Sequence, residues 1–361
     1  METHFYHYPS PFGLESGALL PQITIAYTTL GTLNAEHSNV VWVCHAFTGS
    51  QNITEWWGGI VGVGKLLDPQ KHFIVCANVL GSHYGSTGPL SENPETGEPY
   101  YHNFPSVTVR DVVNSLELLR KHLDIHHIQM CLGGSLGGQQ CVEWAIMNPD
   151  LIENLVLIAT NAQHSSWGIA FNESQRMAIE VDNSWLDKHP NAGIKGMKAA
   201  RAVALLSYRN YYMYDATQER HEDLSKPFRA VTYQHYQAEK LAQRFNAFSY
   251  WHLSKMMDSQ DVGRGRGSVT KALAKIKSKT LVIGIETDAL FPIHEQRFLA
   301  AHIPGAEFQE IKSFYGHDGF LTENELITKA VLVWQKFVKL ETQSLSEVFR
   351  KLDEKFWKEA V

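Results

Sequence analysis

Residues 128–138 read Ile-Gln-Met-Cys-Leu-Gly-Gly-Ser-Leu-Gly-Gly, and this stretch decides the fold. Its first five residues are largely apolar, which predicts a buried β-strand. The glycine pairs that flank Ser135 and Leu136 allow a sharp, strained turn before a helix. Such a turn exposes the serine Oγ beside the helix N-terminus, whose free amides favour developing negative charge. The stretch therefore predicts Ser135 as a nucleophile between a strand and a helix.

A glycine-rich turn between a strand and a helix also serves to bind phosphate, and this is the alternative interpretation. Phosphate-binding turns carry either Gly-x-Gly-x-x-Gly or a Lys followed by Ser or Thr after the glycines. Residues 133–138 contain neither pattern. The Gly-x-Ser-x-Gly pattern often occurs by chance, but its place between a strand and a helix favours the nucleophile.

Further β-rich runs lie on both sides of this stretch. They are Ile23–Thr28, Val40–Cys44, Phe73–Val79, Leu155–Thr160, Thr280–Ile285 and Glu307–Ile311. Helical periodicity lies between several of them, as in Val109–His122 and from Gly137 through Ala145. Strands that are almost wholly apolar suit a parallel sheet covered on both faces. The alternation predicts an open, mostly parallel sheet with helices on both faces.

This alternation is interrupted between Thr160 and Thr280. Residues 163–270 contain no convincing strand and instead show helix-like stretches rich in Ala, Gln, Met and Tyr. We expect one α/β core, formed by residues 1–162 and 271–361, with an all-helical lid inserted at 163–270. Together with the serine turn, this organisation predicts the α/β-hydrolase fold.

The composition argues against several kinds of partner. The chain has 32 Lys and Arg against 38 Asp and Glu, and its net charge of −6 does not favour nucleic acid or an anionic membrane. No window approaches ~20 uninterrupted apolar residues, so we predict no membrane span. The N-terminus lacks a secretory pattern, and the four cysteines lie in apolar contexts without zinc-ligand spacing. We therefore expect a cytoplasmic protein with buried free thiols and no metal.

A serine nucleophile on this fold needs an acid and a histidine, which follow it in that order along the chain. Asp288 lies just after the strand predicted at Thr280–Ile285, in Thr-Asp-Ala-Leu-Phe-Pro. Glu286 is the competing carboxylate, but it is still close to the strand. His317 follows the last predicted strand, in a loop that neighbouring glycines leave free to bend. We predict Ser135, Asp288 and His317 as the catalytic residues.

The oxyanion of an acyl-transfer intermediate needs two backbone amides. In this fold one comes from the residue after the nucleophile, here Leu136. The other comes from the loop after an earlier strand, and that loop reads Cys-His-Ala-Phe-Thr-Gly-Ser over residues 44–50. We predict Phe47 as the second oxyanion-hole residue.

Several motifs occur in an order that resembles the homoserine O-acetyltransferases of the MetX type, from near residue 10 to near residue 340. They are His45–Gly49, Asn78–Ser82, Tyr84–Pro89, the Gly-Gly-Ser-Leu-Gly-Gly turn, Arg244-Phe245, Asp261–Gly267, Asp288–Pro292 and Gly316–Asp318. Several of these are peculiar to that family rather than general to the fold. Phe47 and Leu136 stand where Leu and Met are frequent, which leaves the backbone amides intact but leaves the choice of acyl group open.

The resemblance implies acetyl transfer from acetyl-CoA to L-homoserine, on the route to methionine, with no permanently bound cofactor. It also implies a homodimer joined through the helical lid. The family's homoserine contacts map onto Arg201, Tyr208 and Asp318. Chemistry agrees, since a guanidinium binds a carboxylate in bidentate fashion and a carboxylate binds an ammonium group. The alternative is that Arg201 caps a helix and Asp318 only makes a loop rigid.

Other possibilities remain open at this stage. The acyl donor could be succinyl-CoA, the acceptor L-serine, or the protein a carboxylesterase or an inactive binding protein on the same fold. Trp167 and Trp251 are candidates to line a substrate tunnel, although packing is the more common role of such aromatics. Arg264 and Arg266 are candidates for the CoA phosphates, although we favour a solvated loop.

Overall fold

The structure is a computed structural model, which describes residues 1–220 and 223–338. In these residues the central sheet has eight strands, in the order β1-β4-β6-β5-β9-β10-β11-β12. Its strands are β1 (His4–Tyr8), β4 (Ile23–Leu30), β5 (Val40–Cys44), β6 (Phe73–Ala77), β9 (Ile128–Gly134), β10 (Ile152–Ile158), β11 (Lys279–Ile285) and β12 (Glu307–Ile311). β4 pairs antiparallel with β1 and β6, and the pairs from β6 to β12 are parallel. The predicted mostly parallel sheet is confirmed, and every predicted strand lies in it.

The sequence interpretation missed β1 and two small hairpins. These hairpins are β2 (Phe12–Gly13) with β3 (Leu19–Leu20), and β7 (Glu92–Asn93) with β8 (Glu98–Pro99). β1 is an edge strand whose residues are mostly exposed, so it lacks the apolar run that marked the inner strands.

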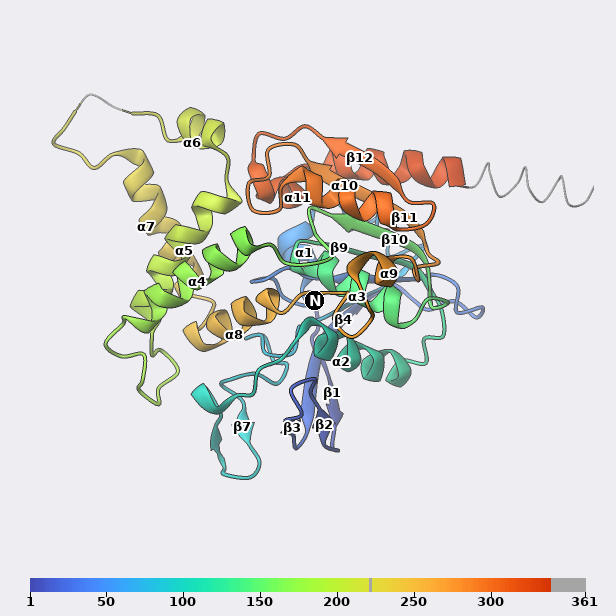
Figure 1. Ribbon diagram of the computed structural model, residues 1–361, viewed down its shortest axis with the longest axis horizontal. Coiled ribbons are helices and arrows are strands. Elements are labelled where there is room, and N and C mark those ends of the chain that lie inside the picture. The colour runs from blue at the N-terminus through green and yellow to red at the C-terminus, as the bar shows by residue number, and fades with distance from the viewer. Residues whose placement is uncertain (221–222, 339–361) are drawn as a thin grey trace, which may run out of the picture.

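Helices cover both faces of the sheet (Figure 1). Successive side chains of a strand point to opposite faces, so each inner strand contributes apolar residues to both. On β5, Trp42 and Cys44 face one apolar core, together with residues of α2 (Val109–His122), α3 (Leu136–Met147) and α10 (Ile293–His302). Val41 and Val43 face a second core, which includes residues of α1 (Ile53–Trp57) and of a helix over 324–338. The sheet therefore has a buried layer on each side.

One of these helices shows how the local sequence sets its own start. α2 begins where predicted because Thr108 accepts a hydrogen bond from the Asp111 amide and Asp111 accepts one from the Thr108 amide. This reciprocal capping satisfies two backbone donors that the first helical turn otherwise leaves free.

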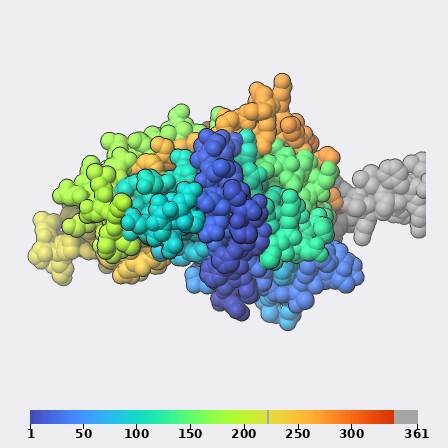
Figure 2. All heavy atoms as spheres, turned by 90° about the horizontal axis from the view of Figure 1, so that it is seen from below, coloured from blue at the N-terminus to red at the C-terminus, as the bar shows by residue number. Residues whose placement is uncertain are grey.

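A run of helices lies between β10 and β11, and we call residues 166–258 the helical lid. It contains α4 (Ser166–Glu180), α5 (Ile194–Tyr208), α6 (Tyr211–Thr217), α7 (Arg229–Ala242) and α8 (Ala247–Asp258). Its two ends are tied together, since the His164 amide donates to Gln260 O and the Val262 amide donates to Ala162 O. The chain then returns to the core through α9 (Val269–Leu273). The lid projects from one side of the core in Figure 2, where it runs from green to yellow.

Three short helical turns complete the described structure, and the second carries His317 and Asp318. They are η1 (Tyr101–Asn103), η2 (Gly316–Asp318) and α11 (Gly319–Thr322). None of the helices within the described ranges has the length and apolar character needed to cross a membrane.

The turn between β9 and α3 is strained and tightly packed. Ser135 has φ 56° and ψ −127°, a left-handed backbone region that a serine rarely adopts. A Cβ added to Gly137 would overlap the carbonyl oxygen of Cys44, so α3 packs directly on the end of β5. A Cβ added to Gly133 would overlap the backbone of Gly137. Only glycine fits where these two backbones approach so closely. The close packing places Ser135 at the carboxyl end of the inner strand β9.

Replacing Gly137 with alanine should destabilise the protein, because backbone atoms cannot move aside as a flexible side chain can. We expect G137A to lower the free energy of unfolding by about 3 kcal/mol. Urea unfolding followed by circular dichroism measures this. G13A is the matched control, since its Cβ would meet only Leu19 Cδ2 at 3.8 Å, and its unfolding midpoint should hardly change. Equal effects of the two substitutions would contradict the packing argument.

Candidate active site

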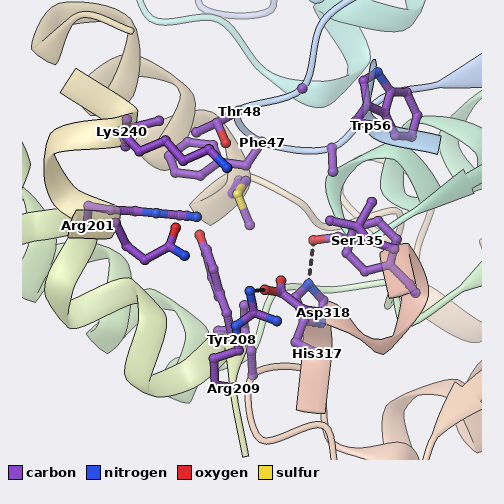
Figure 3. A pocket seen from close by; sticks show the side chains of 18 of the residues that line it. Phe47, Thr48, Trp56, Ser135, Arg201, Tyr208, Arg209, Lys240, His317 and Asp318 are labelled. Carbon is purple, nitrogen blue, oxygen red and sulfur yellow. Dashed lines mark hydrogen bonds and ion pairs between the residues drawn. The ribbon is translucent and has the colours of Figure 1, made fainter. Parts of the chain in front are cut away.

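A cavity of about 280 Å³ lies where the loops at the carboxyl ends of the strands meet the helical lid. The core side of the cavity is formed by residues 46–49 after β5, by Ser135, and by the loop that carries His317 and Asp318. The lid side is formed by residues of α5 and α7, with Arg244 just beyond α7. Figure 3 shows Ser135 and His317 facing Arg201 and Tyr208 across this space. In open α/β sheets the carboxyl ends of strands are the usual place for a ligand.

Three predicted residues form one chain of hydrogen bonds at the base of the cavity. Nε2 of His317 lies 2.9 Å from Oγ of Ser135, and Nδ1 of His317 lies 2.6 Å from Oδ2 of Asp288. The Asp288 carboxylate accepts a hydrogen bond from Nδ1–H, which leaves Nε2 unprotonated to accept one from the serine hydroxyl. The three residues are 3 to 5% exposed, so little water competes for these bonds. This arrangement allows His317 to remove the hydroxyl proton as Ser135 attacks an acyl carbon.

Asp288 is held in place by backbone amides. Its Oδ1 accepts hydrogen bonds from the amides of Leu290 and Phe291, at 2.9 and 2.8 Å, while Oδ2 faces His317. The side chain of the competing Glu286 is exposed. The backbone amide of Glu286 donates to Ile311 O, which continues the pairing of β11 with β12. The geometry therefore favours Asp288 over Glu286 as the acid.

The position of His317 depends on the loop that carries it. Gly316 has φ 67°, and a Cβ there would crowd the backbone where α5 ends, at Tyr208 and Arg209. The Phe291 ring stacks on the imidazole with centroids 5.0 Å apart. These contacts fix the imidazole plane between its two partners.

The amides of Phe47 and Leu136 have no acceptor among the described residues. Leu136 is the first residue of α3, where backbone donors are free. Gln140 joins the two segments, since its Nε2 donates to His45 O at 3.1 Å and to Leu136 O at 3.2 Å. Two free amides in neighbouring segments suit an oxyanion.

His45 holds the loop that carries Phe47. Its Nδ1 lies 2.9 Å from Ala46 O, and its Nε2 accepts the Val79 amide at 2.9 Å. Burial lowers the pKa of His45 to about 4, so the ring is neutral and its Nε2 acts as an acceptor. The sequence interpretation missed this positioning role and that of Gln140, although His45 lies inside a motif that was singled out.

Arg201 and Tyr208 lie on the lid side, two turns apart on α5. The Arg201 guanidinium lies over the Tyr208 ring, 5.4 Å from its centroid. Nε of Arg201 is buried and has no hydrogen-bond partner among the described residues. Burial raises the pKa of Tyr208 to about 12, so its hydroxyl stays protonated. Arg201 lies well inside α5 (Ile194–Tyr208), so the alternative that it caps a helix is wrong.

Asp318 is not free, because Nη2 of Arg209 lies 3.0 Å from its Oδ2. Arg209 was missed in the sequence, where it looks like one more residue of a helix. It is the C-cap residue of α5 and has an extended backbone, φ −107° and ψ 164°. This break turns its side chain toward the cavity, where it orients the Asp318 carboxylate and leaves Oδ1 for another donor.

Trp167 and Trp251, the candidates for a substrate tunnel, do not line this cavity. Trp167 donates from Nε1 to Ala289 O at 2.7 Å, in the loop that follows Asp288, and Trp251 donates to Glu180 at 2.8 Å. These indoles tie the lid to the core and α8 to α4, which is a packing role.

The two arginines considered for the CoA phosphates are paired elsewhere. Arg264 binds Glu15 at 2.7 Å, and Arg266 binds Glu143 at 2.5 Å. Arg110 joins the network through both carboxylates. The loop is exposed at Arg264, Gly265 and Gly267, as we favoured, and lies outside the cavity, and its arginines already have anionic partners.

The cysteines are buried free thiols. Among the described residues, one cluster has the ligand atoms for a metal, with the Sγ atoms of Cys44, Cys131 and Cys141 within 4.8 Å of one another. Burial raises the pKa of the Cys141 thiol, which favours the protonated form that packs in an apolar core. They lie beneath the serine turn and form part of the packed core under α3.

Comparisons with known proteins agree with this geometry. The family model described as alpha/beta hydrolase fold matches residues 39–324. A homoserine O-acetyltransferase of Cyclobacterium marinum is 49% identical over 325 residues, which cover 90% of this chain and 93% of that protein. One of Trichormus variabilis is 40% identical, over 95% of this chain and 96% of its own length.

Solved structures that share this fold include proteins named for different activities. The homoserine O-acetyltransferase from Bacillus anthracis has a TM-score of 0.85 at 24% identity, with 92% of this chain and 96% of that chain covered. The acetyl esterase MekB has a TM-score of 0.81 at 25% identity, with 92% and 94% covered. Shape alone therefore does not separate transferases from esterases, whereas the relatives at 40 to 49% identity do. The chain belongs to the homoserine O-acetyltransferase family, within the α/β-hydrolase fold.

Proposed function

We propose that this protein transfers the acetyl group of acetyl-CoA to the hydroxyl of L-homoserine, in the biosynthesis of methionine. One observation carries the proposal. The hydrogen-bonded Ser135 and His317 face Arg201 and Tyr208 across a single cavity, and Asp318 lies beside His317 on its core side. A nucleophile needs only the first pair, whereas an amino-acid acceptor needs groups for its carboxylate and its ammonium as well.

In the first half-reaction, Oγ of Ser135 attacks the thioester carbonyl while Nε2 of His317 takes the hydroxyl proton. The negative charge on the carbonyl oxygen is stabilised by the amides of Phe47 and Leu136. The carbon–sulfur bond then breaks, the proton passes from His317 to the departing sulfur, and an acetyl ester of Ser135 remains. Asp288 stabilises the imidazolium that forms between these two proton transfers.

In the second half-reaction, the acceptor hydroxyl attacks the ester and His317 takes its proton. Arg201 binds the carboxylate of homoserine, with the Tyr208 hydroxyl beside it, and Oδ1 of Asp318 accepts from the ammonium group. The tetrahedral intermediate collapses, the proton returns to Oγ of Ser135, and O-acetylhomoserine leaves. Because the acetyl group rests on the enzyme between the two steps, the kinetics are ping-pong.

Water is the competing acceptor, and the structure offers two reasons for its exclusion. Ser135 is only 4% exposed, so an ester on its Oγ is sheltered beneath the lid. The charged groups hold the acceptor hydroxyl near the acyl carbon, where proximity outweighs the concentration of water. A carboxylesterase has no need of such groups, which is why Arg201 and Asp318 favour the transferase.

We also propose a cytoplasmic homodimer joined through the helical lid. Large apolar side chains are exposed on the lid, among them Leu206, Tyr211 and Tyr212 at 60, 73 and 67%. These exposed apolar groups lie on the consecutive helices α5 and α6 and favour a protein partner. The buried thiols suit a reducing compartment such as the cytoplasm.

An assay of the purified protein tests the function directly. With acetyl-CoA alone, Ser135 should gain one acetyl group by mass spectrometry of its peptide, and S135A should gain none. Adding L-homoserine should discharge the ester and release free thiol with turnover, and succinyl-CoA or L-serine should support at least tenfold lower kcat/KM. Thiol release that proceeds equally without any acceptor would identify a hydrolase instead.

Arg201→Ala should separate the two half-reactions. We expect KM for homoserine to rise about 100-fold, because a carboxylate loses a bidentate charged partner. Acetylation of Ser135 by acetyl-CoA alone should stay within about twofold of wild type, since that step precedes the acceptor. Arg201→Lys, which keeps the charge but not the planar fork, should give an intermediate KM. A parallel loss in both half-reactions would contradict the assigned role.

Asp288→Asn should lower kcat about 10⁴-fold, as the same change does in comparable triads. The carboxamide no longer fixes the imidazole tautomer that carries its proton on Nδ1, so Nε2 is not free to act as the base. Glu286→Gln is the matched control on the same loop, and its kcat should remain within about twofold. Thiol release at saturating substrates measures both variants. A large loss in E286Q with a small one in D288N would reverse the assignment.

A further inference from the structure

We propose that Lys240, supported by Arg244, binds an anionic group of the acyl donor at the lid side of the cavity. The inference rests on the proposed function and deepens it, because it assigns a donor subsite that the catalytic and acceptor residues leave unfilled. Its first support is the set of charges that line the cavity. Besides His317, these are Arg201, Arg209, Lys240, Arg244 and Asp318.

Only part of this positive charge is balanced within the described chain. Arg209 pairs with Asp318, the one carboxylate of the set. Arg244 donates to neutral groups, Thr48 O at 2.7 Å and the Tyr84 hydroxyl at 2.5 Å. Arg201 and Lys240 have no anionic partner among the described residues. The proposed acceptor brings one carboxylate, which Arg201 takes, so Lys240 and Arg244 remain for a second anion.

Lys240 is directed to the cavity by helical spacing. Gln237, Lys240 and Arg244 follow one another at intervals of three and four, and all three line the cavity. The Arg244 amide donates to Leu241 O, so the turn continues past the end of α7. The neighbouring Glu239 instead pairs with Lys198 of α5, at 2.5 Å. Two like charges on one helix face repel each other unless an anion lies between them.

The position of Lys240 favours the donor over the acceptor. In Figure 3 its amine points into the cavity beside Phe47 and Thr48, while Arg201 lies nearer to Tyr208. Because Phe47 is the proposed oxyanion residue, a thioester held by its amide lies close to this loop and to Lys240. Arg244 holds the same loop through Thr48 O. Lys240 is exposed and also lines the cavity, so its amine is available to a donor group that extends from the cavity toward solvent.

The group that fits is an anion carried by the donor. CoA supplies phosphates, for which a lysine ammonium is a common point-charge partner, and a dicarboxylic acyl group would supply a carboxylate. The sequence suggested two loop arginines as ligands of the CoA phosphates. Both are already paired, Arg264 with Glu15 and Arg266 with Glu143. Lys240 is therefore the donor-side cation that the cavity itself provides.

The test measures the second-order rate constant for acylation of Ser135 with no acceptor present, by rapid quench and mass spectrometry. Three donors are compared: acetyl-CoA, succinyl-CoA and S-acetyl-N-acetylcysteamine, an uncharged thioester. We expect Lys240→Met to lower the rate constant about tenfold with acetyl-CoA and to change it less than twofold with the uncharged thioester. Lys240→Arg should recover most of the loss. Lys198→Met, on the outer side of the same helix pair, is the matched control and should match wild type with every donor.

The outcomes separate the sources of the anion. A similar loss with acetyl-CoA and succinyl-CoA assigns Lys240 to the phosphates, and a loss confined to succinyl-CoA assigns it to the acyl carboxylate. An equal loss with all three donors, or no loss with either charged donor, overturns the inference. Wild-type protein that no donor acylates would instead contradict the proposed function, and with it the donor subsite.

Discussion

The left-handed backbone of Ser135 is the constraint on which the rest of the site depends. It is held by three hydrogen bonds, from the Ser135 amide to Ile158 O and to Ser135 O from the Gln139 amide and the Thr160 hydroxyl. Backbone strain of this kind costs about 1–3 kcal/mol and persists only where neighbours impose it. Here the neighbouring strand and the first turn of α3 impose it. The same turn presents Oγ to His317 and leaves the Leu136 amide free, so one local conformation supplies two functional groups.

The remaining groups come from elements far apart in the chain, and the division of labour follows the architecture. The core supplies the proposed nucleophile, base, acid and oxyanion amides, all of them in segments that follow strands of the sheet. The lid supplies cations, through α5 and α7, which the core loops of this cavity do not. The two parts are tied where they meet, by Arg244 to Thr48 O and by Trp167 to Ala289 O. Chemistry and recognition are therefore set by different segments that share one cavity.

Much of this arrangement was predictable because it depends on order along the chain. Apolar runs gave the inner strands, and the position of Asp288 and His317 after two such strands gave the acid and base. Partners that depend on distant geometry were not predictable. Arg209 needs the end of α5 to turn its side chain, and the role of Arg264 depends on Glu15, 249 residues away. The edge strand β1 was missed because exposure removes the apolar pattern.

The structural similarity to an acetyl esterase raises the question of which part of the site distinguishes a transferase from an esterase. Both activities pass through an acyl-serine, so the groups around Ser135 cannot distinguish them. The difference must lie in what binds the second substrate before water does. We propose that Arg201 has this task here, because its buried Nε has no partner among the described residues and such a group is costly to keep unless a ligand supplies one. Lys240 lines the same cavity but is exposed, and its proposed role lies on the donor side. The unpartnered Arg201, rather than the catalytic hydrogen bonds, is therefore the physical basis on which we propose transfer instead of hydrolysis.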